Sequence, residues 1–170
     1  YGMDTTSDMG IHAFHGRGDP TLDTDSGFTL TFDLRIISET HANDNRAGVS
    51  FITIGKDSTR SLEVAFWEDW IWVYDHNGAF IKGAEFEVDT TVRREYRLRV
   101  QNHNFDLFVD GSPGISGSMV DYTGAGHWPY NAPSTLIFGD DTGSGMSSVE
   151  IYSVQAVPLP PALLLFAAGF

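Results

Sequence analysis

The chain has 170 residues, enough for one domain with a sizeable core, and 41% of them are hydrophobic. Its formal net charge of −13 argues against nucleic acid or anionic lipid headgroups as partners, because phosphate binding needs clustered Lys and Arg. There is no cysteine, which excludes disulfides, thiol catalysis and cysteine-ligated metals.

Short strands are expected along most of the chain. Residues 1–26 are rich in Gly, Asp and Thr, and we interpret them as a loop-rich segment with one short strand near 11–14. From Phe28 to Ile36 apolar and polar residues alternate, which is the period of a half-buried strand. Similar patterns predict further strands at 47–54, 62–66, 71–73, 86–88, 96–100, 105–109, 135–138 and 147–154.

These patterns predict an all-β fold. The clearest hairpin joins 96–100 to 105–109 through Asn102-His103-Asn104, since Asn tolerates positive φ. No segment shows a clean 3.6-residue period, so almost no helix is expected. About eight to ten short strands at this spacing predict an antiparallel β-sandwich or jelly roll.

The hairpin that runs from Tyr96 to Asp110-Gly111 resembles one found in concanavalin A-like and laminin-G-like sandwiches. More broadly, the stretch from 27 to 156 looks like one group of "choice-of-anchor" surface domains. The segments that carry this second resemblance are 38–41, 46–50, 62–72, 89–91 and 138–142. The resemblance implies a sandwich fold and a surface location, and no chemistry.

The chain changes character at Val157, where a Pro-rich stretch leads into a purely apolar run. Proline fixes φ and lacks an amide donor, so an extended connector is favoured over a helix or a paired strand. A membrane-spanning helix needs about 20 apolar residues, and about half that number follow. We therefore expect a docking tail or the first half of a membrane anchor; the alternative is a tail packed on the chain's own core. The anchor residues are Pro158, Pro160, Pro161, Leu163, Leu164, Leu165 and Phe166.

The sequence Val157-Pro-Leu-Pro-Pro-Ala followed by Leu, Phe, Ala and Gly resembles the sorting signal of PEP-CTERM bacterial surface proteins in its VPLPA variant, although the family's terminal basic cluster is missing. The resemblance implies an exported protein, anchored on the periplasmic or cell-surface side of a Gram-negative membrane. Its partners would be lipid or membrane-protein helices. We accordingly divide the chain into a loop-rich segment (1–26), a sandwich (27–156), and a linker with the start of an anchor (157–170).

Aromatic side chains form the first candidate site. If Ile71 and Val73 face the core, the residues that alternate with them share the opposite face of the strand, where they could stack on sugar rings or pack into a partner protein. The alternative is that a second layer of loops covers them and they belong to the core. The predicted ligand or partner surface consists of Trp70, Trp72, Tyr74, Trp128 and Tyr130.

Acidic side chains form the second candidate site. Glu85, Glu87 and Asp89 alternate about 6.6 Å apart, within the range of paired glycosidase carboxylates. Laminarinase-type enzymes carry Glu-x-Asp-x-x-Glu on a strand, but here Val92 replaces the last acid. No Gly-x-Ser-x-Gly, phosphate loop or dinucleotide motif is present either. We therefore expect a solvated acidic face, no catalytic residues and no enzyme.

Two oxygen-rich loops, 43–45 and 140–142, form a third candidate site. Their carboxylates, Asp44, Asp140 and Asp141, suit a structural Ca²⁺, which takes six to eight oxygen ligands. The alternative is Asx-turn chemistry, in which these side chains accept hydrogen bonds from nearby backbone amides. No other cofactor is expected.

Three functions compete at this point. The preferred one is a non-catalytic, membrane-tethered binding or scaffolding domain, for example an accessory subunit of a membrane protein complex. The second is a glycan-binding module of the extracellular matrix that uses Trp70, Trp72 and Tyr74. The third, which needs two carboxylates facing each other across a groove, is a laminarinase-type glycoside hydrolase.

Overall fold

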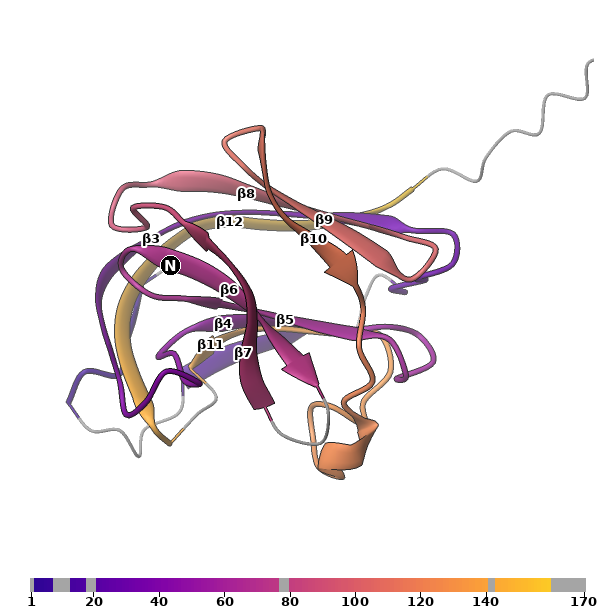
Figure 1. The fold of residues 1–170 in the computed structure, drawn as a ribbon, viewed down its shortest axis with the longest axis horizontal. Coiled ribbons are helices and arrows are strands. Elements are labelled where there is room, and N and C mark those ends of the chain that lie inside the picture. The colour runs from indigo at the N-terminus through magenta and orange to yellow at the C-terminus, as the bar shows by residue number, and fades with distance from the viewer. Residues whose placement is uncertain (1, 8–12, 18–20, 77–79, 141–142, 160–170) are drawn as a thin grey trace, which may run out of the picture.

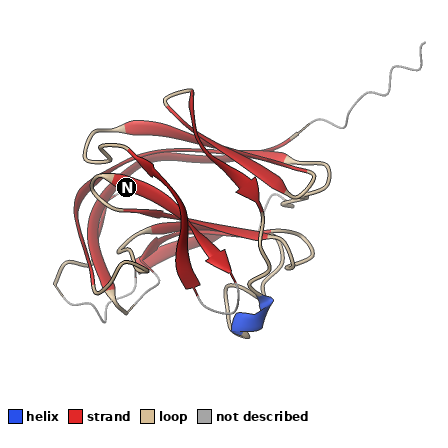
Figure 2. Ribbon diagram, in the orientation of Figure 1, coloured by secondary structure: helices blue, strands red, loops and turns tan. Residues whose placement is uncertain are grey.

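The computed structural model describes residues 2–7, 13–17, 21–76, 80–140 and 143–159. Within these ranges nearly all regular structure is β-strand, with one short 3-10 helix, η1, at Thr123–Ala125 (Figure 2). The strands are β1 Gly2–Asp4, β2 Ala13–Arg17, β3 Phe28–His41, β4 Ser50–Ile54, β5 Ser61–Phe66, β6 Trp70–His76, β7 Phe80–Glu87, β8 Arg94–Gln101, β9 Asn104–Val109, β10 Ser112–Ser118, β11 Thr135–Asp140 and β12 Gly145–Pro158.

The strands form two stacked antiparallel sheets (Figure 1). The first sheet has the order β1-β12-β3-β8-β9-β10, and the second has the order β2-β11-β4-β5-β6-β7. Every pairing between these strands is antiparallel. The predicted all-β antiparallel sandwich is therefore confirmed.

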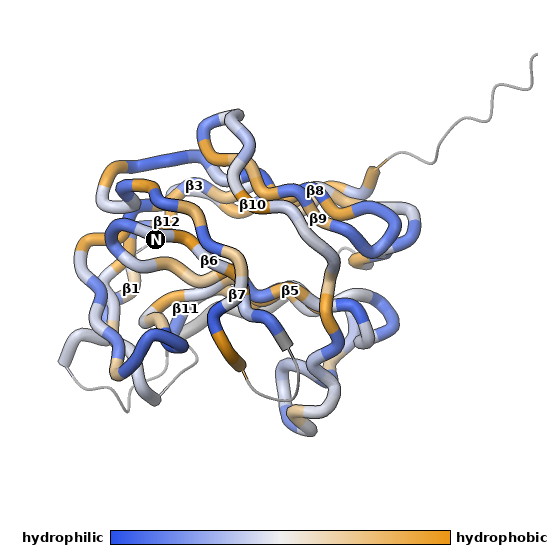
Figure 3. The backbone as a smooth tube through the Cα atoms, in the orientation of Figure 1, coloured by the Kyte–Doolittle hydropathy of each residue, from blue (hydrophilic) through white to orange (hydrophobic). Residues whose placement is uncertain are grey.

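The main core is formed by residues from both sheets. It follows from the alternation of hydrophobic and hydrophilic residues along the strands, which Figure 3 shows by colour. On β3 the residues from Phe28 to Ile36 that point inward are fully buried, and the residues between them are partly exposed. Phe32 stacks on Phe51 of the opposite sheet, with ring centroids 4.0 Å apart, and on Tyr96 of the neighbouring β8 at 5.4 Å. Such aromatic contacts add to the free energy gained by apolar burial.

A second hydrophobic cluster covers the other face of the second sheet. It combines strand residues such as Ile52 and Trp72 with Tyr122 and Tyr130 from the segment 119–134. In Figure 1 this segment, which contains η1, lies below the second sheet, on the side away from the first sheet. The second sheet is thus buried on both faces, which is why β5 is buried at all six positions.

Several strand boundaries differ from those predicted. β1 and the Gly- and Ser-containing β10 lack an apolar alternation that would predict them. β12 continues past the predicted start of the linker, so that Pro158 pairs with Phe28 of β3. Among the described residues, β1 pairs with β12 only at residues 148–150, and no other described strand pairs with this edge of β12. A proline is tolerated at such an edge position, because it has no N–H to donate to a neighbouring strand.

The apolar run after Leu159 lies outside the described residues, together with Pro160, Pro161, Leu163, Leu164, Leu165 and Phe166. The last described residue, Leu159, donates its backbone N–H to the carbonyl oxygen of Gly27 at 2.9 Å. Among the residues that the structure describes, no helix is long and apolar enough to span a membrane.

Candidate functional site

A cavity of about 330 Å³ opens on the outer face of the second sheet, beside the second hydrophobic cluster. Strands β5, β6 and β7 each contribute one side chain, and the loops before β4, before β11 and before β12 complete the wall. Its volume is at the lower end of the range for ligand pockets. The lining residues are Arg46, Glu63, Tyr74, Phe80, His127, Tyr130, Gly143 and Ser144.

Glu63 provides an acidic group deep in this cavity. It is the one charged residue of β5, whose other five residues are uncharged, and only 3% of it is exposed. The hydroxyl of Tyr130 donates a hydrogen bond of 2.9 Å to its Oε2. A buried carboxylate without hydrogen-bond donors is costly, so this bond stabilises Glu63 in its buried position. It also links the loop before β11 to strand β5.

Aromatic rings form the wall of the cavity. The ring of Phe80 lies 4.8 Å from that of Tyr130 and 5.8 Å from that of Tyr74, measured between centroids. Behind them, the Tyr122 hydroxyl donates to the backbone carbonyl of Tyr74 at 2.9 Å. Burial raises the pKa of Tyr122 well above its ordinary value, so this residue acts as a fixed hydrogen-bond donor.

His127 lies at the exposed side of the cavity, with its ring 5.5 Å from that of Tyr130. Its Nδ1 lies 2.9 Å from the carbonyl oxygen of Trp128. A carbonyl can only accept, so Nδ1 carries the proton in this contact, and in the neutral ring Nε2 is the acceptor. His127 therefore adds one hydrogen-bonding nitrogen to the entrance.

The predicted aromatic surface is only partly realised. Trp72 is fully buried beneath the segment 119–134, so it cannot present a ring face to a ligand, and this expectation needs correction. Tyr74 and Tyr130 are 6% exposed and meet at the cavity, whereas Trp128 is 49% exposed. Trp70 is half-buried and does not line the cavity. The alternative, a covering layer of loops, describes Trp72 better.

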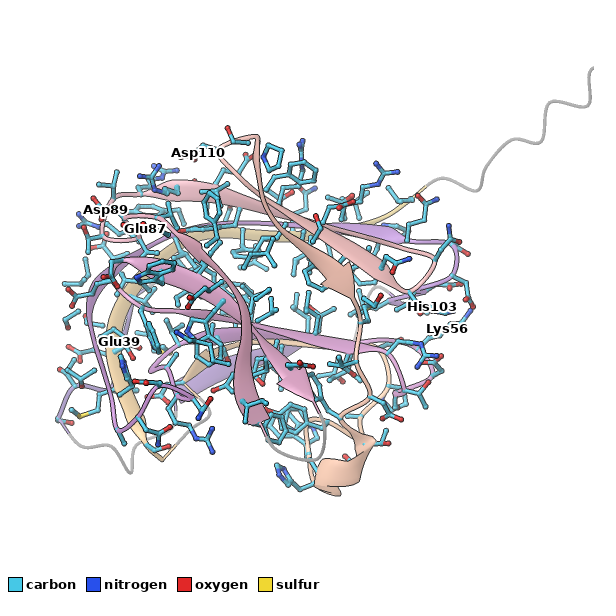
Figure 4. The ribbon with its side chains drawn as sticks, viewed as in Figure 1. Glu39, Lys56, Glu87, Asp89, His103 and Asp110 are labelled. Atoms are coloured by element: carbon cyan, nitrogen blue, oxygen red, sulfur yellow. The ribbon has the colours of Figure 1, made fainter. Side chains whose placement is uncertain are left out.

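The acidic row of the sequence lies elsewhere. Glu85 of β7 forms an ion pair with Lys82 at 2.6 Å. Asp89 follows the strand and accepts hydrogen bonds from the Thr91 hydroxyl and backbone N–H, which lower the pKa of Asp89. Glu87 and Asp89 lie at the opposite end of the molecule from Lys56 and His103 (Figure 4). None of these acids lines the cavity.

The oxygen-rich loops are engaged in hydrogen bonds. The side chain of Asn43 accepts from the backbone N–H of Asn45, which is an Asx turn, and Asp44 is exposed beside it. Asp140 is fully buried and accepts from the Thr5 hydroxyl at 2.5 Å. Asp141 lies outside the described residues. Within the described ranges no group of three or more metal-binding side chains comes together.

Besides Gly143 and Ser144, four cavity residues with large side chains were not predicted from the sequence: Arg46, Glu63, Phe80 and His127. They come from four segments that only the fold brings together. One of them had a local sequence signal: Glu63 is an acidic residue inside the otherwise uncharged strand β5, which the structure shows to be buried at every position.

Solved structures share this fold, although no protein-family model and no curated protein matches the sequence. A carbohydrate esterase from the Shiga toxin-encoding bacteriophage phi24B matches with a TM-score of 0.64 and 13% identity, over 93% of this chain and 80% of that chain. The carbohydrate-binding module CBM66 from Bacillus subtilis matches with a TM-score of 0.51 and 15% identity, over 92% and 91%. Alginate lyase AlyC3 in complex with dimannuronate matches with a TM-score of 0.54 and 14% identity, over 94% and 74%.

The expectation that this chain is not an enzyme has to be corrected. It rested on the interrupted acidic motif at Glu87, Asp89 and Val92 and on the lack of other catalytic motifs. Two of the three similar structures are enzymes, so the fold carries catalysis in other proteins. At these identities the similarity shows the fold alone, and a missing laminarinase motif does not exclude catalysis.

Proposed function

We propose that the domain binds carbohydrate in the cavity over β5, β6 and β7. The observation that carries this proposal is the meeting of three aromatic rings with Arg46, Glu63 and His127 in one 330 Å³ cavity. Sugar rings present apolar C–H faces as well as hydroxyl groups. A site for them therefore needs aromatic area together with a few fixed donors and acceptors.

The glycan-binding function is the second of the three that the sequence suggested, but the binding site proposed here differs from the predicted one. Trp72 is buried, and neither it nor Trp70 lines the cavity. The rings that would contact a sugar are instead those of Tyr74, Phe80 and Tyr130. The fold likeness to a carbohydrate-binding module and to enzymes that act on carbohydrates supports this class of ligand over a purely scaffolding role.

A glycan array followed by calorimetry tests the proposal, with Phe80→Ala as the decisive variant. Aromatic contacts are worth about 0.5–1.5 kcal/mol beyond area burial, so we expect Phe80→Ala to weaken binding about threefold to tenfold. Phe108→Ala is the matched control, because Phe108 is also half-buried but stands on β9 of the other sheet. Equal affinity of both variants for the selected glycan would count against the cavity.

We also propose that the segment from Val157 tethers the domain to a membrane, as the PEP-CTERM resemblance implies. The support is the sequence itself, which has no polar residue after Ala162. In this arrangement the sandwich would hold a glycan on the outer side of the membrane while the tail contacts lipid or partner helices.

A further inference from the structure

We infer that the cavity is specific for a sugar that carries a carboxylate, such as a uronic acid, and that Arg46 binds this group. The inference rests on the proposed carbohydrate-binding function and names its substrate class.

The guanidinium of Arg46 is only half used by the protein. Its Nη1 donates to two backbone carbonyls, those of Asn45 at 2.5 Å and Phe80 at 3.1 Å. Neither carbonyl carries a formal charge, and within the described residues Arg46 forms no ion pair. The Nε and Nη2 donors remain, and this edge of a guanidinium is suited to bidentate binding of a carboxylate.

The loop that carries Arg46 is held in place from several sides. The indole N–H of Trp67 donates to the Arg46 carbonyl at 2.8 Å, and the Tyr74 hydroxyl donates to the Asn45 carbonyl at 3.1 Å. The side-chain oxygen of Asn45 accepts from the backbone N–H of Lys82 at 2.8 Å. The guanidinium is therefore positioned before a ligand arrives, which lowers the entropic cost of binding.

The two opposite charges of the cavity, on Glu63 and Arg46, differ in how deeply they are buried. Glu63 is 3% exposed and covered by the Tyr130 hydroxyl, whereas Arg46 is half-buried and lies nearer to solvent. A ligand carboxylate at Arg46 thus meets the cation first, with the acid of the protein below it. The net charge of −13 repels anions at long range, but screening over about 8 Å at physiological ionic strength leaves the local pair in control.

The test compares two ligands that differ only at carbon 6. Calorimetry measures binding of β-1,4-linked oligomannuronate and of β-1,4-linked mannooligosaccharide of the same length. We expect the uronate to bind at least about tenfold more tightly, which is the scale of one charge-assisted hydrogen-bonded pair. The methyl ester of the oligomannuronate, tested on the same unmodified protein, should bind as weakly as the neutral chain.

Arg46→Gln should abolish this preference, so that the uronate no longer binds more tightly than the neutral oligosaccharide to the same variant. Arg60→Gln is the matched control, because Arg60 Nη1 makes the same kind of bond to the preceding carbonyl, that of Thr59, away from the cavity. Neutral and acidic chains binding equally, or a preference that survives in Arg46→Gln, would overturn the inference while carbohydrate binding stands. No binding of any glycan on the array would overturn both.

Discussion

At the scale of single residues, Asp23 is a carboxylate whose pKa is changed strongly by its hydrogen bonds in the folded protein. It accepts hydrogen bonds from Lys56 Nζ at 2.9 Å and from the backbone N–H groups of Asp25 and Ser26, at the end of the molecule where Lys56 and His103 lie (Figure 4). The Lys56 contact, followed by the backbone bonds, lowers the pKa of Asp23 from 3.8 to about 2. The folded state therefore favours the charged carboxylate.

Acid titration should show this effect with a defined sign. Because the folded pKa lies below the unfolded one, the contribution of Asp23 to stability is fully present above about pH 4 and is lost as the pH falls toward 2. Both side chains are partly exposed, so we expect less than about 1 kcal/mol. Urea unfolding of Asp23→Asn and of the exposed control Asp44→Asn, from pH 6 to 2, measures it. A difference between wild type and Asp23→Asn that stays constant over this range would contradict the prediction.

The hydrogen bond from Tyr130 to Glu63 should make a measurable contribution to the stability of the folded protein. Tyr130→Phe removes a donor to a carboxylate that is 3% exposed, and we expect a loss of about 1–3 kcal/mol in the free energy of unfolding. Tyr152→Phe is the control, because its hydroxyl makes the same bond to Glu150 on the exposed surface and should change stability by less than about 0.5 kcal/mol. Equal losses in denaturant unfolding would show that burial of Glu63 is not what makes the bond matter.

Between the secondary-structure elements, residues 47–48 cross close to the start of β12, with a glycine on each side of the crossing. A Cβ built on Gly48 would lie 2.2 Å from the backbone oxygen of Met146, and one on Gly145 would lie 2.8 Å from the carbonyl of Ala47. These clashes are with backbone, which cannot rotate away. Only glycine allows the two segments to cross at this distance.

Gly48→Ala should therefore destabilise the sandwich by about 1–3 kcal/mol, the usual cost of overpacking. Gly2→Ala is the control, because a Cβ there meets nothing within 4 Å. Urea unfolding at neutral pH compares the two variants. An unchanged midpoint for Gly48→Ala would mean that the crossing has room that the structure does not show.

The sequence predicted individual strands better than it predicted which of their faces are covered. Alternation located β3, β8 and β9, because their inward and outward residues differ in hydropathy. It also separated Ile71 and Val73 from Trp72 and Tyr74, which belong to different hydrophobic clusters. Whether the second set meets solvent depends on the segment 119–134 folding back over the sheet, and no local pattern encodes that contact. The cavity was missed for the same reason.

For the whole molecule, the open question is how the domain is positioned in space. If the segment after Leu159 is a membrane anchor, the full chain should float with neutral phosphatidylcholine vesicles, and a chain ending at Leu159 should not. The shortened chain retains every described residue of the sandwich. Neutral lipid is chosen because a net charge of −13 would be repelled by anionic headgroups. Recovery of both chains in the soluble fraction would contradict tethering by this segment.

Binding of carbohydrate in the cavity is tested most directly by NMR titration of the unmodified protein with the best glycan from the array. We predict saturable shifts in the signals of Glu63, Tyr74, Phe80, His127 and Tyr130, with Phe108 on the opposite sheet unchanged. Shifts confined to other surfaces, or no shifts at ligand concentrations that saturate binding in calorimetry, would contradict the assignment of the cavity as the binding site.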